Sequence, residues 1–238
     1  MADENYTYFV TAQKSTSVTH AVSGAFTSAT DLNLIVSKGC HLEIFTAAED
    51  HVAQTLSVPL YGRVAFMQLF SPGGGSGKQL LLLMTERYDI CVLQFDEASN
   101  TIQTHASSNV RDFIGRPTEC GQIGIVDPKS GLIALHLYDG LLKIVPMDAS
   151  GKFTEAFNVR LEELQVIDMV FLNNAAEPTI CILYEDTKQR RHVRTYKILL
   201  PKKEIVDGPW KQPNVESGAS MLIPLPSPIG GGVLILGQ

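Results

Sequence analysis

The sequence predicts an all-β chain, a β-propeller built of four-stranded antiparallel blades that is incomplete, with about four and a half blades. The first supporting observation is a hairpin pattern, an apolar run, a polar turn and a second alternating run, that recurs about every 50 residues, the period expected of blades. The second is that a strand-like run precedes each hairpin and a more polar run follows it. Together these runs give four strands per repeat.

The hairpins are predicted because β-branched and aromatic residues flank polar or glycine-containing turns. Leu34, Leu82 and Leu135 occupy strand centres, so we expect them to be buried inside blades. The four predicted hairpins span residues 32–46, 80–95, 132–147 and 179–198.

The outer members of each repeat follow from the same pattern. In a blade the inner strands pack on both faces and the last strand faces water, so the last strand should be the most polar. The predicted opening strands are 18–26, 63–70, 122–127 and 166–172; the predicted closing strands are 52–58, 101–106, 156–160 and a poorly defined stretch near Ile205.

A fifth repeat begins with predicted strands over 219–226 and 232–236 and has no later strands. An unclosed propeller leaves an apolar edge without a partner. We therefore expect residues 1–238 to form one domain, an amino-terminal propeller segment truncated within a blade, and to be part of a longer protein.

Composition excludes several classes of protein. The chain is 45% hydrophobic and 18% charged, and it contains no apolar run near the roughly 20 residues of a membrane span, so we expect no membrane partner. The acidic start, Met1 to Asn5, does not resemble a signal peptide. A net charge of −6 argues against direct nucleic-acid binding. The isolated cysteines, interpreted as buried reduced thiols of a cytosolic or nuclear protein, are Cys40, Cys91, Cys120 and Cys181.

A glycine-rich stretch, Gly73 to Lys78, looks like a phosphate-binding loop. Pro72 stands where the motif requires its first glycine, and Gln79 cannot supply the hydroxyl that would bind magnesium. The residues that follow, 80–84, form a predicted strand where the motif requires a helix. We interpret the stretch as a flexible loop between two strands.

Other polar clusters favour structural interpretations as well. His136 lies in an apolar strand and is expected to pack, because no ligand partner is suggested nearby. Glu162 and Glu163 are consecutive and so point apart, which predicts a solvated loop and not an acid/base pair. The basic residues near one hairpin turn are interpreted as a solvated edge in preference to a phosphate patch: Lys188, Arg190, Arg191, His192 and Arg194. We therefore expect no enzymatic activity, no cofactor and no metal site.

Candidate interaction residues lie in connections, because propeller partners meet rim loops and not strand centres. Arg116 is followed by Pro117, which fixes the loop and lowers the cost of ordering the guanidinium. Arg116 could bind a partner or could only tie down its own loop. Trp210, the single tryptophan, lies in a polar segment between prolines, where packing on a blade edge and anchoring a partner are both plausible.

Ten segments of the chain, spread from about Tyr8 to the last residue, resemble in the same order the first propeller of the family of large DNA damage-binding, splicing-factor and polyadenylation-factor subunits. The DNA damage-binding branch resembles them most closely. The segments are Val10-Thr-Ala-Gln-Lys14, Ala25-Phe-Thr-Ser28, Asp31-Leu-Asn-Leu-Ile35, Leu42-Glu-Ile44, Ile114-Gly-Arg-Pro117, Gly124-Ile125 with Asp127-Pro128, Leu137-Tyr-Asp-Gly-Leu141, Phe157-Asn-Val-Arg-Leu-Glu-Glu-Leu164, Pro178-Thr-Ile-Cys181 and Gly208-Pro-Trp-Lys-Gln212.

The resemblance implies a non-enzymatic adaptor of a cullin–RING ubiquitin ligase, found in nucleus and cytoplasm and acting in the DNA damage response and nucleotide excision repair. Such an adaptor has three propellers: the first and third receive helical segments of substrate receptors, and the second, which lies outside this chain, holds the cullin. Damaged DNA is recognised mainly through a partner subunit. The alternative is a nucleic-acid-associated scaffold of a splicing or polyadenylation complex.

The chain departs from the family in two places that bear on partner contacts. Phe113 stands where the family carries a basic residue, and the loop 72–78 is richer in glycine. Either change could alter a contact at the rim. The candidate interaction residues are therefore Phe113, Arg116, Pro117 and Trp210.

Overall fold

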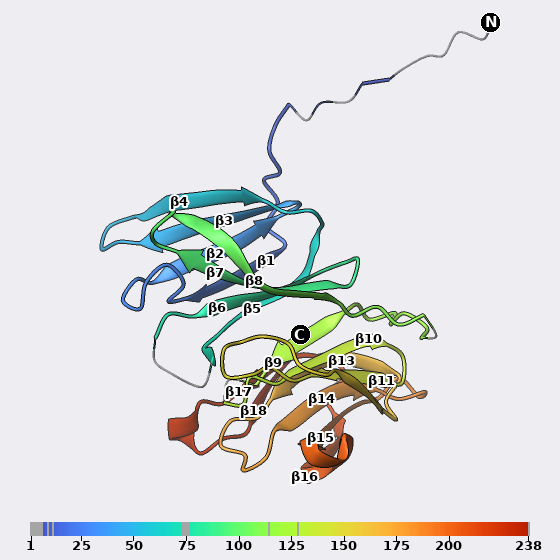
Figure 1. The fold of residues 1–238 in the computed structure, drawn as a ribbon. Helices are drawn as coiled ribbons and strands as arrows, with labels where there is room; N and C mark the ends of the chain where they lie inside the picture. The colour runs from blue at the N-terminus through green and yellow to red at the C-terminus, as the bar shows by residue number, and fades with distance from the viewer. Residues whose placement is uncertain are drawn as a thin grey trace, which may run out of the picture.

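The computed structural model describes residues 7, 8, 10, 12–72, 77–113, 115–127 and 129–237. Four four-stranded antiparallel sheets and one two-stranded sheet follow one another along the chain. Over these residues the sheets form an open arc, as predicted for an incomplete propeller. Figure 1 shows the first two sheets, blue to green, on one side of the arc and the later sheets, yellow to red, on the other.

Each of the first two sheets is a simple up-and-down meander in chain order. The first contains β1 (His20–Gly24), β2 (Asn33–Lys38), β3 (His41–Ala47) and β4 (Val52–Pro59). The second contains β5 (Val64–Phe70), β6 (Leu80–Thr85), β7 (Asp89–Asp96) and β8 (Thr101–Asn109).

The later sheets repeat this order. The third contains β9 (Ile123–Val126), β10 (Ile133–Tyr138), β11 (Leu141–Val145) and β12 (Phe157–Arg160). The fourth contains β13 (Gln165–Phe171), β14 (Thr179–Glu185), β15 (Arg191–Leu199) and β16 (Glu204–Val215), with a short 3-10 helix, Leu200–Lys202, before β16. The fifth contains β17 (Ala219–Pro224) and β18 (Val233–Gly237), joined through the 3-10 helix Ser227–Ile229.

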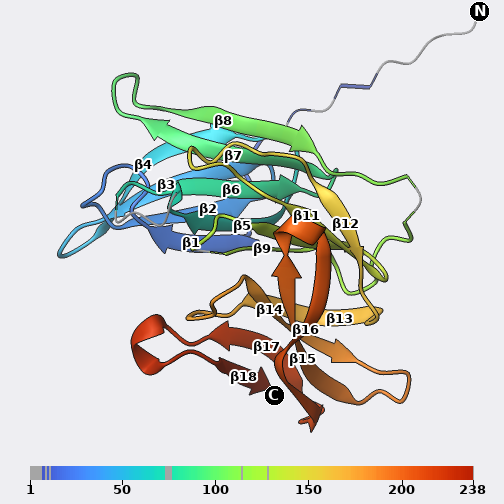
Figure 2. The ribbon, with the colours of Figure 1, turned by 60° about the horizontal axis from the view of Figure 1, so that its bottom comes forward.

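The first strand of each sheet contacts the first strand of the next: β1 with β5, β5 with β9, β9 with β13 and β13 with β17. Apolar clusters fill the space between consecutive sheets. The middle strands are covered on both faces, so β10 is buried at every position and is apolar except at His136. Figure 2, turned by 60°, shows the successive sheets from a second direction.

Two of the three expected core leucines are buried. Leu82 and Leu135 have no exposed surface, but Leu34 is 37% exposed, so its predicted burial was wrong. Ile35, its neighbour, faces the cluster between the first and second sheets. Because side chains alternate along a strand, Leu34 lies on the opposite face, which no described sheet covers.

The poorly defined stretch near Ile205 is in fact the longest strand described, β16. It includes Pro209, Trp210 and Pro213, and it is the outer strand of its sheet, where a missing backbone donor costs no ladder hydrogen bond. The register shifts twice along its pairing with β15. At one of these shifts, the hydroxyl of Thr195 donates a hydrogen bond to the Trp210 carbonyl and accepts one from the Trp210 N–H.

Burial of all four cysteines is not observed. Cys40, in the turn after β2, and Cys120, in the β8–β9 connection, are exposed, whereas Cys181 is buried and Cys91 half-buried. Sequence spacing alone does not distinguish a strand thiol from a turn thiol. Burial raises the pKa of Cys91 to about 11 and that of Cys181 to about 12, so both are protonated at neutral pH.

Several sequence features fall outside the described residues: positions 73–76 of the glycine-rich loop, the first six residues, Ile114 and Pro128. Lys78 is described, and its ammonium donates to the carbonyl of Phe95 at 2.5 Å and pairs with Glu97 at 3.3 Å. The strand β6 begins two residues later, at Leu80, which agrees with the interpretation as a connection between strands.

Candidate functional site

The segment that carries Arg116 is held against the end of β10. Pro117 forms an isolated antiparallel bridge with Tyr138, and the Arg116 carbonyl accepts a hydrogen bond from the N–H of Asp139 at 2.9 Å. A side chain at Gly115 would lie 2.5 Å from the Tyr138 ring, so only glycine allows this close approach. The loop is therefore fixed by the third sheet.

The Arg116 side chain is 70% exposed. Its guanidinium pairs with Glu119, and its Nε lies 3.5 Å from Oδ2 of Asp139. These contacts orient the side chain toward the turn between β10 and β11 but leave most of it open to solvent. Both sequence-based alternatives, a loop tether and a partner contact, are compatible with this geometry.

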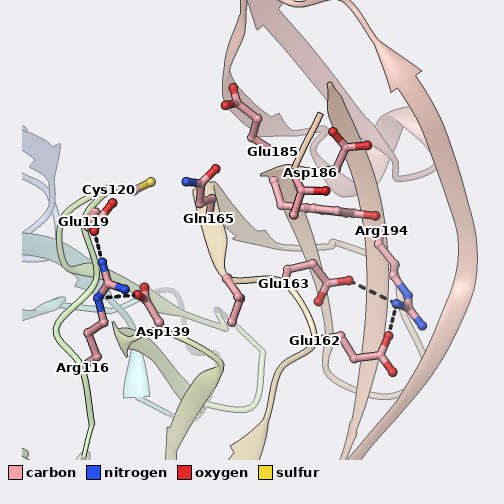
Figure 3. Close-up of a pocket in the computed structure, with 13 residues that line it drawn as sticks. Arg116, Glu119, Cys120, Asp139, Glu162, Glu163, Gln165, Glu185, Asp186 and Arg194 are labelled. Carbon is pink, nitrogen blue, oxygen red and sulfur yellow. Dashed lines mark hydrogen bonds and ion pairs between the residues drawn. The ribbon is translucent and has the colours of Figure 1, made fainter. Parts of the chain in front are cut away.

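A pocket of about 450 Å³ lies beside Arg116, between the loops of the third and fourth sheets. Figure 3 shows two charged groups on opposite sides of it, Arg116 with Glu119 and Asp139, and Arg194 with Glu162 and Glu163. The remaining lining residues are Cys120, Leu164, Gln165, Tyr184, Glu185, Asp186 and Thr187. The topology thus brings four loops, distant in sequence, to one place.

The Arg194 group was missed by the sequence interpretation, which placed Glu163 in a solvated loop. Glu163 is buried, and Tyr196 donates its hydroxyl to the Glu163 carboxylate at 2.8 Å. Nη1 of Arg194 donates to Glu162 at 2.7 Å and to Glu163 at 3.1 Å, and Nη2 donates to Asp207 at 2.7 Å. Glu162, by contrast, is exposed as predicted. The alternation of side-chain directions within one segment cannot reveal that the Arg194 group includes partners on other strands, here β15 and β16.

The electrostatics of this group fix its protonation. Although burial lowers the pKa of Arg194, its hydrogen bonds to Glu162 and Asp207 raise that pKa well above the usual range. Burial, and then the hydrogen bond to Glu163, raises the pKa of Tyr196 well above the usual value of a tyrosine. Arg194 is therefore a permanent cation, and Tyr196 is a neutral phenol that donates its hydroxyl hydrogen to Glu163.

Most of the basic residues in and beside the β14–β15 turn lie against carboxylates, whereas the Lys188 ammonium has no ion-pair partner among the described residues. Arg190 contacts Asp186 at 2.9 Å, and Arg191 contacts Glu185 at 3.3 Å. His192 accepts the N–H of Asn214 at Nδ1, so its proton lies on Nε2, which faces Asp186 at 3.1 Å. The turn is accordingly a largely solvated edge in which carboxylates neutralise most of the basic side chains.

The other candidate residues lie apart from the pocket lining. Phe113 is on the same loop as Arg116 and is 92% exposed, with the Arg111 guanidinium 5.8 Å from its ring centroid. Trp210 is 36% exposed and borders a smaller hollow of about 190 Å³ with Arg194 and Lys211. The structure therefore places Arg116 in the pocket lining, with Pro117 next to it in the chain, and leaves Phe113 and Trp210 outside the lining.

Two further observations limit the chemistry of this region. Cys120 is exposed as a residue, but partial desolvation of its thiol, and then the carboxylates of Asp139 and Glu119, raise the pKa of that thiol, which disfavours the reactive thiolate. Within the described ranges, no three His, Cys, Asp or Glu side chains are grouped as a bound metal ion would require.

No helix in the described part of the chain is long and apolar enough to cross a membrane.

Residues 17–238 match the family model described as the RSE1/DDB1/CPSF1 first beta-propeller. The chain belongs to this family. Among its relatives are DNA damage-binding protein 1b of Arabidopsis thaliana, 52% identical, and the DNA damage-binding protein 1 sequences of Solanum lycopersicum, 50% identical, and Oryza sativa subsp. japonica, 49% identical. Each alignment covers 98% of this chain and 21% of the relative. The resemblance drawn from the sequence is thus confirmed, and the chain spans about a fifth of the length of the curated relatives it matches.

Proposed function

We propose that this propeller segment belongs to a protein-interaction scaffold, the adaptor subunit of a cullin–RING ubiquitin ligase that recruits substrate receptors. The observation that supports it most is the identity of about half of all positions with DNA damage-binding protein 1 sequences across 98% of the chain. The adaptor acts in the DNA damage response and nucleotide excision repair, in the nucleus and the cytoplasm, without catalysing a reaction itself.

The rim geometry supports partner binding by this segment. Arg116 is held at its backbone while 70% of its side chain stays exposed, so a partner can contact it at a small cost in ordering. Phe113 adds an exposed aromatic ring to the same loop, a residue type enriched in protein interfaces. Receptor segments contact this rim, and the cullin binds through a later propeller outside the chain.

Contact with damaged DNA is indirect in this proposal and passes through a partner subunit. The acidic balance of −6 and the carboxylate pairing of Arg190, Arg191 and Arg194 both oppose phosphate binding. The alternative, a scaffold of a splicing or polyadenylation complex, is consistent with the breadth of the family model. The names of the relatives favour the DNA damage-binding branch.

Affinity purification of the tagged full-length protein, before and after ultraviolet irradiation, tests the proposal. We expect a cullin and at least one substrate receptor to co-purify in stoichiometric amounts. The matched control is the same tagged protein with Leu135→Asp, whose first propeller should be unfolded and whose receptor recovery should fall. Recovery of splicing or polyadenylation subunits in place of the cullin would reject the adaptor assignment and favour the alternative.

A further inference from the structure

The pocket between the third and fourth sheets holds more carboxylates than its arginines neutralise. Six lining residues are acidic and two, Arg116 and Arg194, are basic. Arg190 and Arg191 reach two of the carboxylates from outside the lining. Within the described residues, one carboxylate oxygen of each of four side chains has no hydrogen-bond or ion-pair partner: Glu119, Asp139, Glu162 and Glu185. The pocket therefore has spare acceptors and a negative balance.

Apolar surface lies beside these acceptors. Leu164 lines the pocket and is 58% exposed, and Tyr184, stacked on His192, contributes an aromatic ring. A long basic side chain combines an apolar stem with a cationic head, so it matches both parts of the lining. An anion would instead have to displace the carboxylates that already bind Arg116 and Arg194.

The loops that form the pocket hold it open. Gly115 and Pro117 fix one wall against Tyr138, and the Arg194 group links the opposite wall to β16 through Asp207. A preformed pocket loses little entropy when a side chain enters it. Its volume of about 450 Å³ is within the range of ordinary ligand sites.

We propose that this pocket binds an arginine or lysine side chain presented by a basic segment of a partner protein. The proposal rests on the scaffold function above and specifies the partner chemistry at one site. The cation contacts the free oxygens of Glu119 and Glu185 from opposite walls, while its stem packs on Leu164. The guanidinium of Arg116, on the rim, contacts a different group of the same partner.

The test uses the full chain and a fluorescent amphipathic helical peptide that carries leucines and two arginines on one face. The pocket variant is Glu119→Gln with Glu185→Gln, which keeps side-chain shape and removes two charges. Its matched control is Glu49→Gln with Glu216→Gln, which removes two charges from exposed turns away from the pocket. A second peptide with citrulline in place of arginine removes the positive charges alone.

We expect fluorescence anisotropy to show that the arginine peptide binds roughly tenfold more weakly to the pocket variant and about equally well to the control variant. Peptide binding to the unmodified chain should weaken with added salt. Melting curves of both variants should coincide with that of the unmodified chain. Equal binding to the two variants, equal binding of the citrulline peptide, or no binding to the unmodified chain would each overturn the pocket proposal. With a full-length pocket variant, receptor recovery equal to that of the unmodified protein would reject the pocket and leave the scaffold function standing, whereas the cullin, which binds a later propeller in this proposal, should co-purify in either case.

Discussion

Asp168 ties the fourth sheet to the fifth: its Oδ2 accepts a hydrogen bond from the backbone N–H of Leu222 at 2.6 Å. The second and third sheets are linked in the same way, since Oε1 of Gln68 accepts the N–H of Val126 at 3.0 Å. In both cases a polar side chain of one opening strand binds the backbone of the next. Apolar packing between sheets has little directionality, so these bonds help to set the position of one sheet against its neighbour.

Asp168→Ala should therefore destabilise the chain by about 1–3 kcal/mol, because it leaves a half-buried backbone donor without its acceptor. Hydrogen exchange should speed up at the Leu222 amide in particular. Asp168→Asn keeps an acceptor oxygen and should recover part of the loss. If the Leu222 amide exchanges equally fast in all three proteins, the bond does not join the sheets.

His136 should make the stability of the chain depend on pH. The imidazole is fully buried, neither ring nitrogen has a hydrogen-bond partner among the described residues, and burial lowers its pKa from 6.5 to about 4. The unfolded chain takes up a proton below about pH 6.5 and the folded chain does not. The neutral His136 therefore contributes fully to the free energy of unfolding above pH 6.5. This contribution is lost as pH falls toward 4, by up to about 3 kcal/mol.

Denaturant unfolding between pH 7 and pH 4 tests this dependence. His136→Leu removes the titrating group from the apolar strand and should flatten the curve over that range. His51→Leu, an exposed control, should leave the slope unchanged. A curve for His136→Leu as steep as that of the unmodified chain would assign the acid sensitivity to other groups.

Leu135 and Leu34 provide a matched pair for the packing between sheets. Leu135→Asp buries a carboxylate without a partner and should unfold the third sheet and its neighbours. Leu34→Asp places the same charge where the leucine is already 37% exposed, so it should cost much less. Circular dichroism melting of the two variants gives the comparison, and similar losses would show that the outer face of the first sheet is also covered.

Gly115→Ala should disturb the loop of Arg116 without unfolding the sheets. The new methyl group would meet the Tyr138 ring at 2.5 Å. That ring stacks on Tyr88, and the Tyr138 hydroxyl accepts a hydrogen bond from the N–H of Asp112. We expect a loss of about 1–3 kcal/mol, typical of overpacking, and faster exchange of the Asp112 amide. Gly121→Ala, where a side chain would meet open space but the φ of 95° is strained, tests backbone strain alone.

The strands could be predicted from sequence because alternation and turn residues are local signals. Each predicted hairpin matches two observed strands, such as β6 and β7. What the sequence did not reveal depends on contacts between sheets: the exposed face of Leu34, the burial of Glu163 and the three carboxylates around Arg194. The loop of Arg116 was singled out through Pro117, whereas its neighbours across the pocket, Glu162 to Arg194, come from segments 46 to 78 positions later, and no local pattern links them.

The most direct test of the scaffold account measures receptor affinity and melting temperature together for Arg116→Ala in the full-length protein. The account predicts roughly tenfold weaker receptor binding, because a rim contact is lost, with a melting temperature close to that of the unmodified protein. Arg87→Ala, an exposed arginine in the β6–β7 turn, is the control and should change neither quantity. A lower melting temperature with unchanged receptor affinity would contradict the account and show that Arg116 serves only its own loop.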